Sequence, residues 1–405
     1  MTCTSKALAV LLALMITGCS RSGDFGESGK EVPLTDVLTL ELTFGAGDID
    51  EAYVLVRPDP AQGVGVDIEG YIMVVDEDHV KVFDGNGVPK RLVGGTGAGP
   101  GEFSRPRSLW VSPNGYYAVL GEGSLANFFR PDHSWIERID CASTPLFLEV
   151  MEANRLLPQG PEAVYCLGET ERIYAVDSRD QDPQNRARKE IYLFYQDSDS
   201  LHVLAHYPQS NNIVGPMGRS ITTSAWGCLL VAPLPGRRLV YLHTYHDSRT
   251  TAEGSFYRLT FLDLDSMNRT YLDHRYTPVE IEPWEPLSYP EEYRQRNPEQ
   301  WRLTQQMNEI VEEFLAERKY ESPLINLCTD ERFVFAFTTT RNDSNQVKVD
   351  VFDADHRSYL CSAWFPKTNL RIRNGYAYRV SDYFGKAAYP QVEKYRIDPR
   401  VYGRR

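Results

Sequence analysis

The sequence predicts an all-β protein built from six copies of one four-stranded unit. Each copy begins with a short apolar strand, passes through a polar turn and continues into a second strand rich in valine and tyrosine, and a repeat of this kind indicates a repetitive β-architecture. The copies occupy residues 64–75, 108–120, 163–176, 220–231, 324–337 and 370–380. The 24 tyrosines and 17 phenylalanines agree with this class, because aromatic side chains are enriched in strands.

The last copy lacks a fourth strand of its own. It ends near Val392–Ile397, whereas the alternating run Val37–Phe44 near the start of the chain belongs to no copy. An unpaired strand edge promotes aggregation. We therefore expect the N-terminal strand to complete the last unit and close the ring.

A glycine-rich stretch, Gly94–Phe103 followed by Pro106, joins the first copy to the second. No helix tolerates so many glycines and a proline, so the stretch is expected to form a turn. A phosphate-binding loop would need a helix directly after it, and here the strand at Ser108–Val111 follows. The sequence therefore favours a connection between two sheets over an anion-binding loop.

The same stretch resembles the linker of NHL-type six-bladed β-propellers, through the pattern Gly-Gly-x-Gly-x-Gly-Pro-Gly-Glu-Phe-x-x-Pro and the later Asn114-Gly115. The resemblance implies six four-stranded blades around a central channel, formed by residues 34–405 as one domain. It is specific for the fold and says little about function, since such propellers serve as binding platforms, sensors and occasionally enzymes.

One segment, at about residues 290–320, has helical rather than strand periodicity. Asn297 and Pro298 mark a helix start, and an apolar face follows at Met307, Ile310, Val311, Phe314 and Leu315. The helix falls between the fourth and fifth copies, on the face that also carries the long loops 178–189, 246–254, 339–346 and 381–391. Such a face is typical of binding, and the helix is either a plug over the channel or a lid for a partner. Trp284 and Trp301 are the tryptophans that a partner could contact.

The N-terminus resembles a bacterial lipoprotein signal. Residues 1–18 contain Lys6 and a short apolar run, too short to span a bilayer, and the run ends in Ile16-Thr-Gly-Cys19, which looks like a lipobox. The resemblance implies lipidation of Cys19 and a flexible tether over residues 19–33. No aspartate follows the cysteine, which favours the outer membrane of the cell envelope.

Composition excludes some partners. The net charge of −13 argues against nucleic acid and against adhesion to anionic lipid, since both need a basic face. Beyond the signal and Cys19, five cysteines remain, an odd number with no Cys-x-x-Cys spacing, so their pairing stays open and no zinc or redox site is indicated. They are Cys141, Cys166, Cys228, Cys328 and Cys361.

Metal and nucleophile chemistry have little support. No histidine falls in an inner-strand run, and His243 and His246 would face opposite sides of a strand. The calcium set of propeller lactonases could draw only on Asp67, Asn326 and Glu149. We expect no cofactor and no catalytic residue, although a divalent metal at the channel mouth remains the premise of one alternative below.

Arginines near the ends of the predicted inner strands are the candidate ligand-binding residues. Together with Asn326, they could bind a carboxylate or an acidic sugar at the channel mouth, or each could pair with a nearby acid. They are Arg105, Arg107, Arg219, Arg371 and Arg373.

The sequence thus favours an envelope-anchored, non-catalytic binding or scaffold module for a protein or small ligand. The alternatives are a metal-dependent hydrolase or lyase with its site at the channel mouth, and a surface glycan-binding protein.

Overall fold

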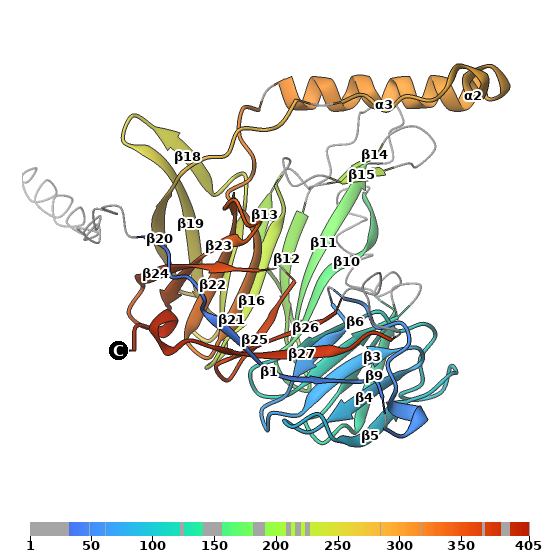
Figure 1. Ribbon diagram of the computed structural model, residues 1–405, viewed down its shortest axis with the longest axis vertical. Coiled ribbons are helices and arrows are strands. Elements are labelled where there is room, and N and C mark those ends of the chain that lie inside the picture. Colours follow the sequence, from blue (N-terminus) through green and yellow to red (C-terminus); the bar gives the residue numbers. More distant parts are fainter. Residues whose placement is uncertain are drawn as a thin grey trace, which may run out of the picture. The chain divides into compact units, whose positions relative to one another are not determined.

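The computed structural model divides into two units, Met1–Val32 and Pro33–Arg405, and the second holds the folded body (Figure 1). The predicted signal, Cys19 and nearly all of the tether lie outside the described residues. The structure describes residues 32–47, 49–60, 62–121, 125–140, 156–180, 191–207, 212–214, 220–222, 227–283, 285–316, 318–366, 369–381 and 389–404.

Pro33–Arg405 forms a six-bladed β-propeller, as predicted (Figure 1). Blade one contains β2 (Val64–Val66), β3 (Ile72–Asp76), β4 (His79–Phe83) and β5 (Pro89–Gly94). Blade two contains β6 (Ser108–Val111), β7 (Tyr117–Leu120), β8 (Leu125–Phe129) and β9 (Trp135–Asp140). Blade three contains β10 (Leu156–Cys166), β11 (Arg172–Asp180), β12 (Ile191–Gln196) and β13 (Leu201–Tyr207).

Blade four contains β16 (Leu229–Leu234), β17 (Arg238–His243), β19 (Gly254–Asp263) and β20 (Arg269–Tyr276), with the short β18 (Ser248–Thr251) paired to β19. Blade five contains β21 (Leu324–Asp330), β22 (Phe333–Arg341), β23 (Val347–Asp353) and β24 (Ser358–Phe365). Blade six contains β25 (Arg371–Arg373), β26 (Tyr376–Val380) and β27 (Val392–Ile397).

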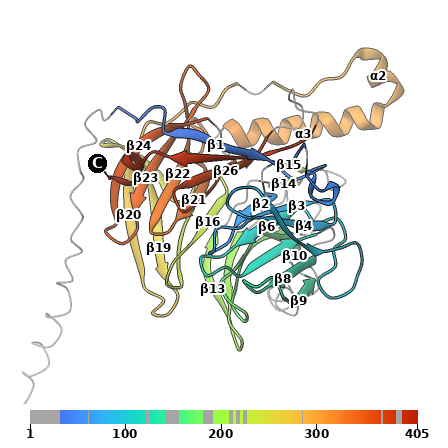
Figure 2. The same ribbon diagram turned by 60° about the horizontal axis from the view of Figure 1, so that its bottom comes forward.

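The N-terminal strand β1 (Leu38–Phe44) supplies the fourth strand of blade six (Figure 2). It runs antiparallel to β27, with Leu38 opposite Ile397 and Phe44 opposite Val392. The predicted closure is therefore confirmed, and the two ends of the folded body are joined by main-chain hydrogen bonds.

The described residues form six buried apolar clusters that hold the ring together, one between each pair of consecutive blades. Strand β3 shows how: Val74 packs towards blade six, while its neighbour Val75 packs towards blade two. Because successive side chains of a strand point to opposite faces, a strand between two blades must be apolar on both. This explains the unbroken run Ile72-Met-Val-Val75.

The predicted start of blade four was wrong. The run at 220–223 was expected to be its inner strand, but β15 (Ser220–Thr222) pairs with β14 (Asn212–Val214) in a separate two-stranded sheet. The inner strand is β16, whose Leu229 and Val231 are buried in the cluster between blades three and four. A local hairpin satisfies the backbone of the shorter run, whereas the longer apolar run has to be buried.

The helical insertion lies between β20 and β21, as expected, and consists of α2 (Glu291–Arg296) and α3 (Pro298–Ala316). The Asn297 main-chain carbonyl accepts a hydrogen bond from Trp301 N (3.0 Å), but its side-chain amide donates back to Tyr293 O of α2 (3.1 Å). Leu303, Met307 and Val311 are buried, which confirms the apolar face. The side chains of Ile310 and Phe314 lie outside the described residues.

No helix in the described part of the chain is long and apolar enough to cross a membrane.

The glycine-rich stretch is a structural turn, and strand β6 rather than a helix follows it. Arg138 of β9 donates hydrogen bonds to the main-chain oxygens of Ala98 (2.8 Å), Gly99 (2.9 Å) and Glu102 (2.5 Å). The Glu102 carboxylate in turn accepts from Gly99 N (2.6 Å). The carbonyls and amides of this turn are thus largely bound within the protein.

Candidate ligand site in the propeller channel

The central channel contains a cavity of about 430 Å³. Inner strands of blades one, two, four, five and six line it. The polar side chains in the lining belong to Gln62, Trp110, Asn326, Cys328, Thr329, Asn369, Arg371 and Arg373. A cavity of this size accommodates a small ligand.

Amides mark the end of the channel at which the inner strands begin. We call this the insertion end, since the connections carrying α2, α3 and β18 are on it. Gln62 precedes β2 and accepts a hydrogen bond from Ser108 Oγ (2.6 Å), while Asn369 precedes β25 and donates to Pro60 O (2.8 Å). These bonds join neighbouring blades around the opening, so both amides are held in position at the entrance.

Arg373 lies towards the opposite end of the channel. It is the last residue of β25, and its Nη2 donates to the main-chain oxygen of Pro113 (2.9 Å) in the turn after β6. This bond spans from blade six to blade two. The Nε of Arg373 is buried and has no hydrogen-bond partner among the described residues.

Arg371 lies two positions earlier and interacts with the thiol of Cys328 on β21. Burial raises the pKa of Cys328, and the nearby Arg371 opposes this only in part. The Cys328 thiol also donates to Leu370 O (3.4 Å) and lies 3.5 Å from the Asn326 amide nitrogen. The thiol therefore stays protonated at neutral pH and acts as a buried polar group rather than as a nucleophile.

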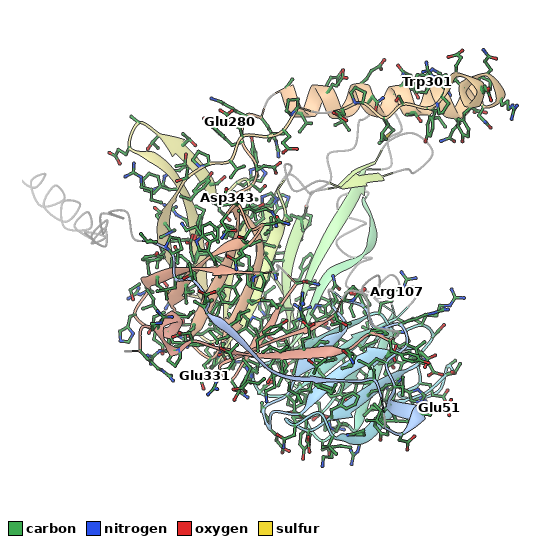
Figure 3. All side chains as sticks on the ribbon, in the orientation of Figure 1. Glu51, Arg107, Glu280, Trp301, Glu331 and Asp343 are labelled. Carbon is green, nitrogen blue, oxygen red and sulfur yellow. The ribbon has the colours of Figure 1, made fainter. Side chains whose placement is uncertain are left out.

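Three of the predicted ligand-binding residues are brought together: Asn326, Arg371 and Arg373 all line the cavity. Arg105 and Arg107 do not line it, and both residues are exposed. Figure 3 labels Arg107. Arg219 lies outside the described residues. Of the five predicted arginines, the described lining of the cavity contains Arg371 and Arg373.

Sequence reasoning missed Gln62, Asn369 and Pro113. All three lie within a few residues of a predicted inner strand, and flanking positions of inner strands are where such residues would be sought. The sequence could not show which of these flanking residues meet at the channel, because that depends on the order and tilt of all the blades.

The tryptophans of the insertion are only partly placed. Trp284 lies outside the described residues. Trp301, on α3, is half-buried, with the Arg294 guanidinium 4.8 Å from its ring centroid and Tyr289 at 6.4 Å (Figure 3). It is thus the centre of a small cluster within the insertion.

The prediction for His243 and His246 was wrong, since their ring centroids are only 4.7 Å apart. β17 ends at His243, and a turn closed by Asp247 N donating to His243 O (2.9 Å) brings the two rings to one side. Nδ1 of the fully buried His243 accepts from the main-chain nitrogens of Tyr245 and His246, each at 3.3 Å. This ring nitrogen is therefore already used as an acceptor within the turn.

The described residues contain no group of three or more His, Cys, Asp or Glu side chains placed to hold a metal ion. Asp67, one of the three residues considered for calcium, accepts from the main-chain nitrogens of Glu69 (2.9 Å) and Tyr71 (2.8 Å) and so stabilises a turn. Glu149 and Cys141 lie outside the described residues. No disulfide joins the four described cysteines, Cys166, Cys228, Cys328 and Cys361.

These observations define the class of the protein as a six-bladed β-propeller with a polar, cationic channel cavity. No family model and no curated protein sequence matches the chain.

Solved structures with similar architecture are distant in sequence. The "Putative exported protein (BF0058)" of Bacteroides fragilis is 13% identical, with 91% of this chain and 97% of that one covered and a TM-score of 0.45. The β-propeller domain of Cps50 (Swd1) from Myceliophteria thermophila is 11% identical, with 84% and 98% covered and a TM-score of 0.36. BamB from Moraxella catarrhalis is 10% identical, with 89% and 100% covered and a TM-score of 0.32. Likeness at this level says nothing about ligands.

Proposed function

We propose that this protein is a non-catalytic binding module of the bacterial cell envelope whose channel takes a small carboxylate-bearing ligand. The guanidinium of Arg373 in the lining of the channel cavity carries the proposal. Arg371 adds a second guanidinium to the same cavity, and guanidinium groups bind carboxylates through paired N–H donors.

The ligand enters from the insertion end. The Arg373–Pro113 hydrogen bond spans the opposite end, while the amides of Gln62 and Asn369 stand at the entrance. An entering carboxylate therefore meets amides first and the arginines deeper in the channel. The helical insertion and β18 are on the same end and give a protein partner access to it.

The lining supports binding rather than turnover. Its described residues include no Asp, Glu or His that could act as a general base, and burial keeps the Cys328 thiol protonated. A ligand held here would meet donors and an apolar wall.

The envelope location rests on the lipobox-like Ile16-Thr-Gly-Cys19. Lipid on Cys19 would tether the propeller to the outer membrane through residues 19–33, and the propeller itself would be of NHL type. The net charge of −13 suits a body that stands off an anionic lipid surface.

Calorimetric titration with succinate, and with its neutral counterpart succinamide, tests the channel site. We expect succinate to bind and succinamide to fail, and Arg371→Gln to weaken succinate binding about tenfold or more, since charge-assisted hydrogen bonds are the strong ones. Arg107→Gln is the matched control, because Arg107 is exposed and outside the cavity. Equal binding of both compounds, or equal effects of both variants, would refute a carboxylate site in the channel.

A further inference from the structure

A second cavity, of about 380 Å³, lies between the end of blade four and the segment by which the insertion returns to β21. It shares no lining residue with the channel cavity. Its described lining consists of Thr244, Tyr245, His246, Ser248, Arg249, Thr250, Tyr276 and the run Arg318–Ser322. Seven of these twelve side chains carry hydroxyl groups and four are charged, so the cavity is polar.

The strand register decides which side chains share the wall from blade four. Thr250 lies opposite Ser255, and Ser255 lies opposite Tyr276, so these three side chains are on one face of the sheet. Thr250 Oγ1 and Ser255 Oγ are hydrogen-bonded at 2.9 Å. This face offers a row of hydroxyl groups.

Arg249 borders the cavity, but its side chain belongs to the opposite face of the sheet. It pairs in register with Phe256, and its guanidinium carbon is 5.6 Å from that ring centroid. Its Nη2 donates to the Asp273 carboxylate (2.7 Å). The guanidinium of Arg249 is therefore paired with Asp273 on the face of the sheet that points away from the cavity.

The other wall is held rigidly. Ile281 N donates to Lys319 O (3.1 Å) and Glu321 N donates to Val279 O (2.8 Å), so the returning segment pairs with the start of the insertion. Figure 3 labels Glu280 in that first segment, and its carboxylate is 3.3 Å from Lys319 Nζ.

Arg318 is oriented by an aromatic ring. Its guanidinium carbon is 3.8 Å from the ring centroid of Tyr245, which is a close cation–π contact. Stacking fixes the plane of the guanidinium while its N–H donors lie in that plane. Lys319 beside it is a second cation of the lining, which also contains the acid Glu321, and Lys319 pairs with Glu280 at 3.3 Å.

We infer that this cavity binds an acidic sugar. The carboxylate is held by Arg318 with support from Lys319, and the sugar hydroxyls by the hydroxyl row of blade four and by Tyr320. The volume is within the range of small-molecule sites, of roughly 300–1,000 Å³. Tyrosine rings and hydroxyl groups suit a ring that is polar at its edge and apolar on its faces.

D-glucuronate and D-glucose are the probes, because they share a ring and differ at one carbon, which bears either a carboxylate or a hydroxyl group. Chemical-shift titration at low salt is expected to show glucuronate binding, with glucose at least about tenfold weaker. Arg318→Gln should weaken glucuronate binding by about tenfold, whereas Arg258→Gln should leave it unchanged, because Arg258 pairs with Asp273 (2.7 Å) and is not in the cavity lining. The glucuronate affinity of Arg318→Lys should fall between those of the two glutamine variants, since lysine keeps the positive charge but loses the paired N–H donors of the guanidinium.

The channel site is tested separately. Arg371→Gln should leave glucuronate binding at this cavity intact, so that failure of one site does not hide the other. Circular dichroism establishes that each variant is folded. Glucose binding as tightly as glucuronate, equal loss in Arg258→Gln and Arg318→Gln, loss confined to Arg371→Gln, or no binding at all would each overturn the proposal.

Discussion

Replacing Lys81 with methionine is expected to destabilise the propeller strongly, although the change keeps most of the side-chain volume. Lys81 and Asp76 form a buried ion pair in blade one, with 2% and 1% of their surfaces exposed and a distance of 2.8 Å between Nζ and Oδ2. Lys81 also donates to Val54 O (2.6 Å). The Asp76 carboxylate accepts from the main-chain nitrogens of Val56 (2.8 Å) and Arg57 (2.6 Å).

The magnitude follows from what remains after the change. Lys81→Met leaves a buried carboxylate without its cation, and removing one partner of a buried pair costs about 3–5 kcal/mol. Two main-chain N–H donors still reach Asp76, so we expect the lower end, about 3 kcal/mol. This is a large share of a typical free energy of unfolding of about 5–15 kcal/mol.

Urea denaturation followed by circular dichroism measures the effect. The matched control is Lys90→Met in the same blade, because Lys90 pairs with Asp84 at 3.0 Å with 44% of its side chain exposed, and such pairs contribute about 0–1 kcal/mol. The double variant Asp76→Asn/Lys81→Met should lose less stability than Lys81→Met alone, since it buries no unpaired charge. If Lys81→Met costs no more than Lys90→Met, or the double variant is the least stable, the reasoning is refuted.

Two further predictions concern pH and anchoring. Burial lowers the pKa of His274, and the Asp350 carboxylate opposes this in part, so below about pH 6.5 the unfolded chain binds more protons than the folded protein and stability falls. The urea midpoint should therefore drop between about pH 7.5 and pH 5.5, and it should drop less in His274→Gln. Equal slopes of the urea midpoint against pH in the two proteins would contradict this. Cys19→Ala should abolish incorporation of labelled palmitate and release the protein from the membrane fraction, while Cys3→Ala, within the predicted signal, should change neither; labelled Cys19→Ala protein would exclude the anchor.

Local sequence patterns predicted most of the fold. Alternating apolar strands, glycine-rich turns and one capped helix depend only on neighbouring residues, so five of the six blades, the helix α3 and the closing strand β1 were all identified. Closure could be inferred because the N-terminal strand has no partner in any blade and the last blade lacks its fourth strand. Pairing the two satisfies the backbone hydrogen bonds of both edges.

Blade four and the site needed the tertiary structure. The runs at 220–222 and 229–234 are both strands, and only burial against blades three and five shows that the second is the inner one. Likewise, the sequence contains five candidate arginines, but only blade order and strand length decide that Arg371 and Arg373 reach one cavity while Arg107 stays exposed.

The second cavity likewise could not be predicted from the sequence. Arg318 is an ordinary charged residue in the sequence, and its stacking on Tyr245 exists only because the insertion returns beside the end of blade four. Periodicity determined which residues form strands, since it reflects the geometry of the chain itself. Which side chains meet across blades depends on long-range packing, and that was decided by the assembled ring alone.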